Sequence, residues 1–137
     1  MNKSFICLAC GTLNDKKHHG GLRKFCNQKC QQVYMHNEYI TRWKNGLEES
    51  RKGLQTSSHI RRYIVDKFEN ICQGCSQTSV HNGKPLTMQL EHIDGDSSNN
   101  KEENLSLLCP NCHTQTEFYG SKNLGRGRSS ILKEMRK

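Results

Sequence analysis

A carboxylate and two imidazoles lie in the polar stretch between Lys84 and Tyr119. Glu91 and His92 are adjacent in the chain, and His113 follows further along. Carboxylate and imidazole groups bind divalent cations, and a neutral imidazole also accepts a proton near neutral pH. These residue types could therefore support metal-assisted acid–base chemistry, if the fold brings them together.

Two short apolar runs must position these side chains. The first alternates with polar residues, as a half-buried strand does, and comprises Leu86, Met88 and Leu90. The second contains Leu105, Leu107 and Leu108 and ends before Pro110, which cannot continue a central strand. The loop between the two runs is rich in Asn and Asp, so we expect an antiparallel pair joined by more than a tight turn.

A short helix is expected directly after the second strand. Asn111 can cap this helix, which then carries His113 in its first turn. The order strand, loop, strand, helix places the end of the first strand beside the start of the helix. Glu91, His92 and His113 are therefore expected to converge.

All eight cysteines occur as close pairs, and pairs of this kind are typical of zinc sites. We predict one site from Cys7, Cys10, Cys26 and Cys30, and a second from Cys72, Cys75, Cys109 and Cys112. Free buried cysteines are the alternative, and a thiol redox site is disfavoured because no suitable strand–helix frame surrounds Cys7 or Cys72. His18 and His19 are interpreted as surface residues, since four cysteines already complete a tetrahedron.

The composition limits the fold and the partners. Only 32% of the 137 residues are hydrophobic, so small metal-stapled units are expected in place of one large core. The formal charge of +8 favours a nucleic acid as partner. An anionic membrane surface is a weaker alternative, because no strongly amphipathic basic helix is evident. A basic protein without a polyanion partner is the remaining alternative.

No run of 18 apolar residues exists, so no transmembrane helix is expected. The N-terminal residues MNKSFICLACG lack the apolar stretch of a secretion signal. We therefore expect a protein of the reducing cytoplasm, where clustered cysteines bind metal and do not form disulfides.

The chain divides into four expected segments. Residues 1–45 form a zinc finger and a helix that ends at Asn45-Gly46, and the polar residues 46–58 form a linker. Residues 59–120 form the main domain and begin with a helix over 59–70, which Ser57 or Ser58 caps. This helix has an apolar stripe at Ile60, Ile64 and Phe68. Residues 76–85 are expected to be a polar excursion, and 121–137 a basic tail.

The sequence PLTMQLEHIDGD, followed by NN and ENLSLLCPNCHTQT, resembles the His-Asn-His (HNH) endonucleases of the ββα-metal class. The resemblance covers residues 84–119 and extends more weakly upstream to His59. It implies an α+β protein in which a zinc-stapled ββα-metal unit follows a small zinc finger and helices. The finger resembles the treble-clef or ribbon type that ends in Phe-Cys-x-x-x-Cys.

The resemblance also implies roles for individual residues. His92 would be the general base, and Glu91 and His113 would bind a catalytic Mg²⁺ or another divalent metal. Asn104 would brace the loop against the strand, and it is the candidate to orient the His92 ring. Asp or His is commoner in the family at the position of Glu91, which is one methylene longer than Asp and binds the metal directly or through water. Glu117 is either a further ligand or a surface carboxylate.

The implied function is that of a DNA endonuclease of the phage or mobile-element (homing) type, working in the bacterial cytoplasm if a phage encodes it. One active site would nick one strand, so the chain could act as a monomer or as a dimer. Candidate phosphate contacts, each alternatively a solvated surface charge, are Arg61, Arg62, Lys122, Arg126 and Arg128. The alternative function is a non-catalytic, zinc-dependent DNA-binding regulator.

Overall fold

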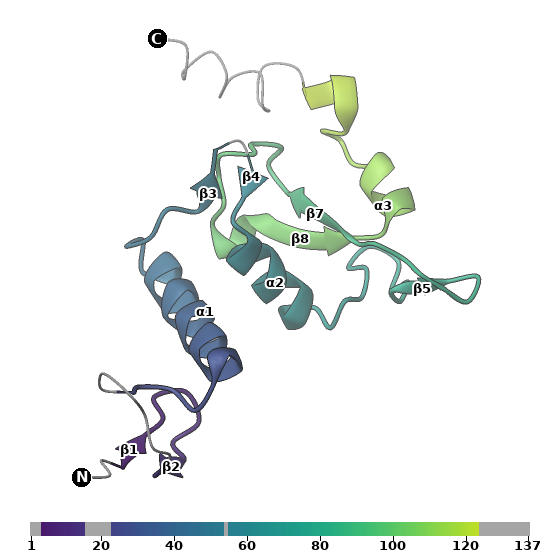
Figure 1. The fold of residues 1–137 in the computed structure, drawn as a ribbon. Coiled ribbons are helices and arrows are strands. Elements are labelled where there is room, and N and C mark those ends of the chain that lie inside the picture. The colour runs from purple at the N-terminus through teal and green to yellow at the C-terminus, as the bar shows by residue number, and fades with distance from the viewer. Residues whose placement is uncertain (1–3, 16–22, 54, 124–137) are drawn as a thin grey trace.

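The computed structural model of the chain describes residues 4–15, 23–53 and 55–123 (Figure 1). The N-terminal part pairs strand β1 (Phe5–Ile6) with strand β2 (Leu13–Asn14) in an antiparallel hairpin. Helix α1 (Gln28–Lys44) follows, and the Asn27 side chain caps it by accepting a hydrogen bond from the Cys30 backbone N–H at 2.9 Å. The helix ends at Lys44 with Asn45 as its C-cap, as the predicted stop at Asn45-Gly46 requires.

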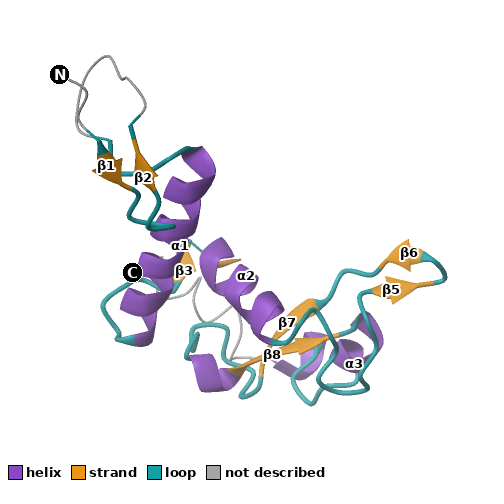
Figure 2. Ribbon diagram, turned by 90° about the horizontal axis from the view of Figure 1, so that it is seen from below, coloured by secondary structure: helices purple, strands orange, loops and turns teal. Residues whose placement is uncertain are grey.

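The second part consists of a helix, a strand pair and a second, short helix. Helix α2 (Ser58–Lys67) precedes strands β7 (Gln89–His92) and β8 (Leu105–Leu108), and helix α3 (Pro110–Thr114) follows them. The strands are antiparallel, with Gln89 opposite Leu108 and His92 opposite Leu105. Helix α2 packs on β8, and α3 contacts both strands (Figure 2). The expected mixed α and β class is confirmed, as is the strand–loop–strand–helix order.

The core lies between α1, α2 and β8. Ile60 and Ile64 of α2 are fully buried beside Leu107 of β8, as the apolar stripe of α2 predicts. Trp43 adds the end of α1 to the same cluster. Cys72 and Cys109 are also members, so one cysteine cluster is continuous with the core.

Two stretches expected to be irregular form hairpins. Within 46–58, strand β3 (Arg51–Lys52) pairs with β4 (Gln55–Thr56), and within 76–85, β5 (Val80–His81) pairs with β6 (Lys84–Pro85). The second hairpin turns at Asn82-Gly83, whose φ angles of 50° and 70° suit the mirror-image turns of hairpins. The strands are too short for a periodic apolar pattern to reveal them.

Two helix boundaries differ from the prediction. Helix α3 is capped by Cys109 in place of Asn111, because Pro110 fits the first helical position and the Cys109 sulfur accepts from the Cys112 N–H at 3.4 Å. Helix α2 stops at Lys67, since Glu69 and Asn70 adopt φ angles of 52° and 55° that leave the helical region. Short 3₁₀ turns occur at η1 (Glu102–Asn104) and η2 (Gly120–Asn123). Among the described residues, none of the helices has the length and apolar character needed to cross a bilayer.

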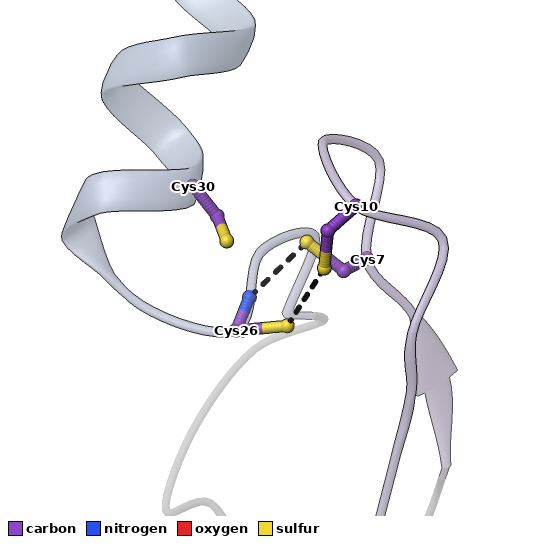
Figure 3. Close-up of side chains that lie close together, drawn as sticks. All are labelled: Cys7, Cys10, Cys26 and Cys30. Carbon is purple, nitrogen blue, oxygen red and sulfur yellow. Dashed lines mark hydrogen bonds between the residues drawn. The ribbon is translucent and has the colours of Figure 1, made fainter.

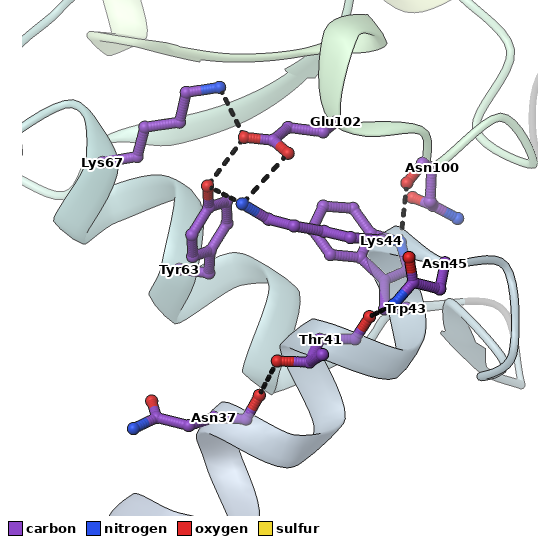
Figure 4. A network of polar contacts seen from close by, with 9 residues as sticks. All are labelled: Asn37, Thr41, Trp43, Lys44, Asn45, Tyr63, Lys67, Asn100 and Glu102. Atoms are coloured by element: carbon purple, nitrogen blue, oxygen red, sulfur yellow. Dashed lines mark hydrogen bonds and ion pairs between the residues drawn. The ribbon is translucent and has the colours of Figure 1, made fainter.

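The η1 turn is tied to both long helices by one carboxylate (Figure 4). Glu102 Oε1 lies 2.8 Å from Lys67 Nζ and accepts from the Tyr63 hydroxyl at 2.7 Å. Its other oxygen lies 3.3 Å from Lys44 Nζ. Hydrogen bonding to Lys67, with help from Tyr63 and Lys44, lowers the pKa of Glu102 to about 2 despite some desolvation. This network stabilises the loop that leads from β7 to β8.

Glu102→Gln is expected to lower the free energy of unfolding at pH 7 by about 1 kcal/mol, as loss of a partly exposed charge network should. The folded-state pKa lies below the ordinary value of 4.5, so the stabilisation is complete well above pH 4.5 and is lost as the pH falls toward 2. Urea unfolding of both proteins at pH 7 and pH 4 checks this. An equal difference at the two pH values would contradict it.

Candidate active site

Glu91 and His113 face each other across the junction of β7 and α3. Glu91 Oε2 lies 3.0 Å from His113 Nε2, and the side chains are 12% and 28% exposed. Two ligand atoms at right angles around a cation, each about 2.1 Å from it, lie about 3 Å apart. The pair therefore fits two neighbouring positions of an octahedral divalent cation and leaves the other positions for water and phosphate oxygens.

His92 directly follows Glu91 at the end of β7, and an amide holds its ring. His92 Nε2 lies 2.8 Å from Asn100 Oδ1. The sequence pointed to Asn104 as the residue that orients the ring, but in the structure the amide at the ring belongs to Asn100. The two asparagines lie in the same loop, so the pattern of residue types alone does not distinguish them.

Asn104 is buried and braces the loop that follows His92. Its Nδ2 donates to Asp94 Oδ1 at 2.9 Å and to the Asn99 carbonyl at 2.7 Å, and its Oδ1 accepts from the Asp94 N–H at 3.0 Å. Desolvation raises the pKa of Asp94, but hydrogen bonds from Asn99, Asp96 and Asn104 lower it by more. The loop is therefore closed around an ionised carboxylate.

Gly95 allows the same loop to approach the chain after α3. Its φ is +72°, and a Cβ there would lie 2.4 Å from Phe118 Cγ, so no larger residue fits. The next residue, Tyr119, places its ring edge-on to His113 at a centroid distance of 5.2 Å. The segment after α3 thus contacts both the loop and the His113 ring.

The N-terminal cysteines form a cluster suited to one metal ion (Figure 3). The sulfur atoms of Cys7, Cys10, Cys26 and Cys30 all lie within 4.8 Å of one another. Tetrahedral zinc with Zn–S bonds of about 2.3 Å requires S···S distances of about 3.8 Å. Burial raises the pKa of Cys7, but backbone N–H groups including that of Cys26, 3.4 Å away, bring it to about 6. The cluster can therefore bind zinc after small adjustments.

The second cluster joins the start of the main domain to its closing helix. The sulfur atoms of Cys72, Cys75, Cys109 and Cys112 also lie within 4.8 Å of one another. Backbone N–H groups point at two of them, from Gly74 to Cys72 and from Cys112 to Cys109, each at 3.4 Å. A Cβ on Gly74 would lie 3.1 Å from the Cys112 sulfur, so the cradle accepts glycine best. This cluster can also bind zinc.

The basic residues predicted to contact phosphate lie at different places in the structure. Arg61 lines a cleft of about 520 Å³ whose wall includes His92, Lys52 and Gln55, and it donates from Nη2 to the Met88 carbonyl at 3.1 Å. Arg62 instead lies 3.8 Å from Asp66 on an exposed face of α2 and is not among the residues lining this cleft. Lys122 is exposed in η2. Arg126 and Arg128, the rest of the expected tail, and His18 and His19 lie outside the described residues.

Glu117 is exposed and belongs to neither of the metal-ligand clusters found among the described residues.

The sequence did not reveal the part that Asn100, Lys52 and Gln55 play at this site. The doubled Asn99-Asn100 was a usable signal, because an amide side chain that becomes buried in the loop after His92 needs a hydrogen-bond partner. Lys52 and Gln55 carried no signal, since only the packing of the β3–β4 hairpin brings them to the cleft.

Comparison with known proteins identifies the segment that carries these residues. Residues 72–118 match the family described as HNH endonuclease. We refer to this matching segment as the HNH domain. The HNH domain begins at the first cysteine of the second cluster and includes Glu91, His92, Asn104 and His113.

One similar protein aligns with a larger part of the chain than the family match does. The H-N-H endonuclease F-TflIV of Escherichia phage T5 is 36% identical over 92 residues. The alignment includes 65% of this chain but 40% of the phage protein, so the chain spans about two fifths of the length of this relative. No solved structure matches the chain.

The two cysteine clusters should differ in what they stabilise. We expect two zinc ions per native chain and one in Cys10→Ser or Cys75→Ser, measured by elemental analysis. Cys75→Ser should lower the unfolding midpoint of the HNH domain strongly, because its cluster is continuous with the core. Fluorescence of Trp43, the single tryptophan, reports this transition. Cys10→Ser is the matched control, and equal shifts in both variants would contradict the assignment.

Proposed function

We propose that this chain is a metal-dependent DNA endonuclease that hydrolyses phosphodiester bonds. The observation that carries the proposal is the convergence of Glu91 and His113, 3.0 Å apart, with His92 directly after Glu91 in the segment that matches the HNH family. The formal charge of +8 suits a polyanionic substrate, and the phage relative is an endonuclease by name.

His92 would act as general base. Its neutral imidazole takes a proton from a water molecule, and the resulting hydroxide attacks the phosphorus as the bond to the 3′ oxygen breaks. The leaving oxygen takes up a proton from solvent, so the products carry a 5′-phosphate and a 3′-hydroxyl. A divalent cation held by Glu91 and His113, such as Mg²⁺, would stabilise the charge on the phosphate and on the leaving oxygen. Asn104 keeps the loop closed so that His92 stays beside the other two residues.

The cleft beside His92 is the proposed path of the DNA strand. Lys52 and Arg61 supply positive charge to its wall, and Gln55 supplies a neutral hydrogen-bonding group. Contacts to phosphates position a nucleic acid on a protein. Positive charge next to the general base, His92, would therefore place the scissile phosphate there. The 1–45 segment, with its own cysteine cluster, is proposed to be a separate zinc finger joined to the nuclease unit through α1.

Three further details belong to this proposal: the mode of cleavage, the structural metal and the place of action. We propose that the protein nicks one strand per event, that both structural clusters hold zinc, and that it works in the cytoplasm of a bacterial host if a phage encodes it. A double-strand break would then need two chains or two successive events.

The decisive test of this function is cleavage of supercoiled plasmid with Mg²⁺ or Mn²⁺. The native chain should convert plasmid to open circles, and His92→Ala should slow this at least about 100-fold because the base is lost. His81→Ala, at an exposed histidine of β5, is the matched control and should cut at the native rate. If no protein cuts with any divalent metal but all shift the plasmid in gels, the chain is a non-catalytic DNA-binding regulator. Equal cutting by native and His92→Ala proteins would show that the assigned base is wrong.

Arg61 and Arg62 provide a test of the cleft with matched charge loss. Arg61→Ala should weaken DNA binding about tenfold at 0.1 M salt, because one desolvated phosphate contact is lost. Arg62→Ala removes the same charge from outside the cleft and should change affinity less than about threefold. Fluorescence anisotropy with a labelled duplex in Ca²⁺ measures both. Equal effects would mean that the DNA does not follow this cleft.

A further inference from the structure

Asn100 makes contacts to four other side chains from one buried position. Its residue surface is 3% exposed. The side-chain Oδ1 lies 2.8 Å from His92 Nε2 and accepts from the Thr56 hydroxyl at 2.8 Å, while Nδ2 donates to Ser50 Oγ at 3.3 Å. Its backbone carbonyl accepts from Trp43 Nε1 at 3.0 Å (Figure 4).

These contacts determine which nitrogen of His92 carries the proton. An amide oxygen only accepts hydrogen bonds, so the contact with Asn100 Oδ1 requires a proton on His92 Nε2. The neutral ring then has its lone pair on Nδ1. Within the described residues, Nδ1 of His92 has no hydrogen-bond partner, so this atom is available to a water molecule.

The other three partners of Asn100 come from outside the segment that matches the HNH family. Trp43 is on α1, Ser50 precedes the β3–β4 hairpin and Thr56 is in β4, whereas the match begins at residue 72. The hairpin therefore does more than lead into α2. Together with Ser50 just before it, the hairpin supplies the hydroxyl groups that hold the Asn100 amide in its orientation, and a buried amide without such partners would be costly.

We infer that Asn100 is a positioning residue for the reaction. It holds His92 in the Nε2–H form and so presents Nδ1 as the atom that takes the proton from water, with Thr56 and Ser50 fixing the amide. This inference rests on the proposed nuclease function. It makes cleavage depend on the hairpin that precedes the HNH domain.

The first measurement is which nitrogen of His92 is protonated. In ¹H–¹⁵N spectra of the native full chain loaded with zinc, His92 should show a hydrogen-bonded Nε2–H proton that exchanges slowly with water. In Asn100→Ala this proton should exchange too fast to be seen. A proton found on Nδ1 in the native chain would overturn the inference.

Kinetics then separate positioning from folding. Asn100→Ala should lower kcat for plasmid nicking on the order of 100-fold, with KM changed less than about threefold, because the base is misplaced while the DNA contacts remain. Thr56→Val should lower kcat in the same way to a smaller extent, and Thr56→Ser, which restores the hydroxyl, should recover it. The Thr56 pair keeps the test valid if Asn100→Ala does not fold.

Asn37→Ala is the matched control. Asn37 has the same side chain but is exposed on α1, where its backbone carbonyl accepts from the Thr41 hydroxyl at 2.9 Å. This variant should keep the native kcat and the Nε2–H signal. If the native chain cuts DNA and Asn100→Ala cuts it at the same rate, the role of Asn100 is overturned while the proposed nuclease function stands. A native chain that never cuts DNA would overturn the proposed function and the catalytic role together.

Discussion

The geometry of the HNH domain depends on four sulfur atoms that lie within 4.8 Å of one another, on Cys72, Cys75, Cys109 and Cys112. Hydrogen bonding to Cys75 and Cys109, together with burial, raises the pKa of the Cys112 thiol to about 12, so four thiolates do not coexist there without a cation. A bound metal ion would remove this conflict and would add stability to a chain of which only 32% is hydrophobic. Because Cys72 and Cys109 belong to the core, the cluster also determines where β8 ends and α3 begins.

The candidate active site follows from that junction. His113 directly follows Cys112, so its position relative to β8 is set by the cluster. Glu91 is paired with Ser106 in the neighbouring strand, and this register brings its carboxylate to the imidazole. The loop between the strands is closed by hydrogen bonds of Asn104 and by the approach of Gly95 to Phe118. A metal ion in this cluster would therefore also help to set the distance between Glu91 and His113, the two proposed ligands of a second, catalytic metal.

The loop is also attached to the N-terminal half of the chain at two neighbouring points. Asn100 meets Trp43, Ser50 and Thr56, and Glu102 meets Lys44, Tyr63 and Lys67. One point consists of buried neutral hydrogen bonds, and the other is a partly exposed charge network. Through Asn100, these contacts make the position of the His92 ring depend on where α1 and the β3–β4 hairpin lie. The segment before the HNH match is therefore part of the site and not only a tether.

The sequence by itself determined what depends on neighbours along the chain: the four cysteine pairs, the apolar stripe of α2, the helix end at Asn45, and the strand–loop–strand–helix order around Glu91, His92 and His113. Spacing and local conformation decide these features. Only the tertiary structure decided that Asn100 meets His92, that Cys109 caps α3, that β3 pairs with β4 at the cleft, and that Arg61 but not Arg62 lines it. Each of these features depends on which distant elements pack together. The energy of that packing comes from contacts between residues far apart in the sequence, and a local pattern does not reveal such contacts.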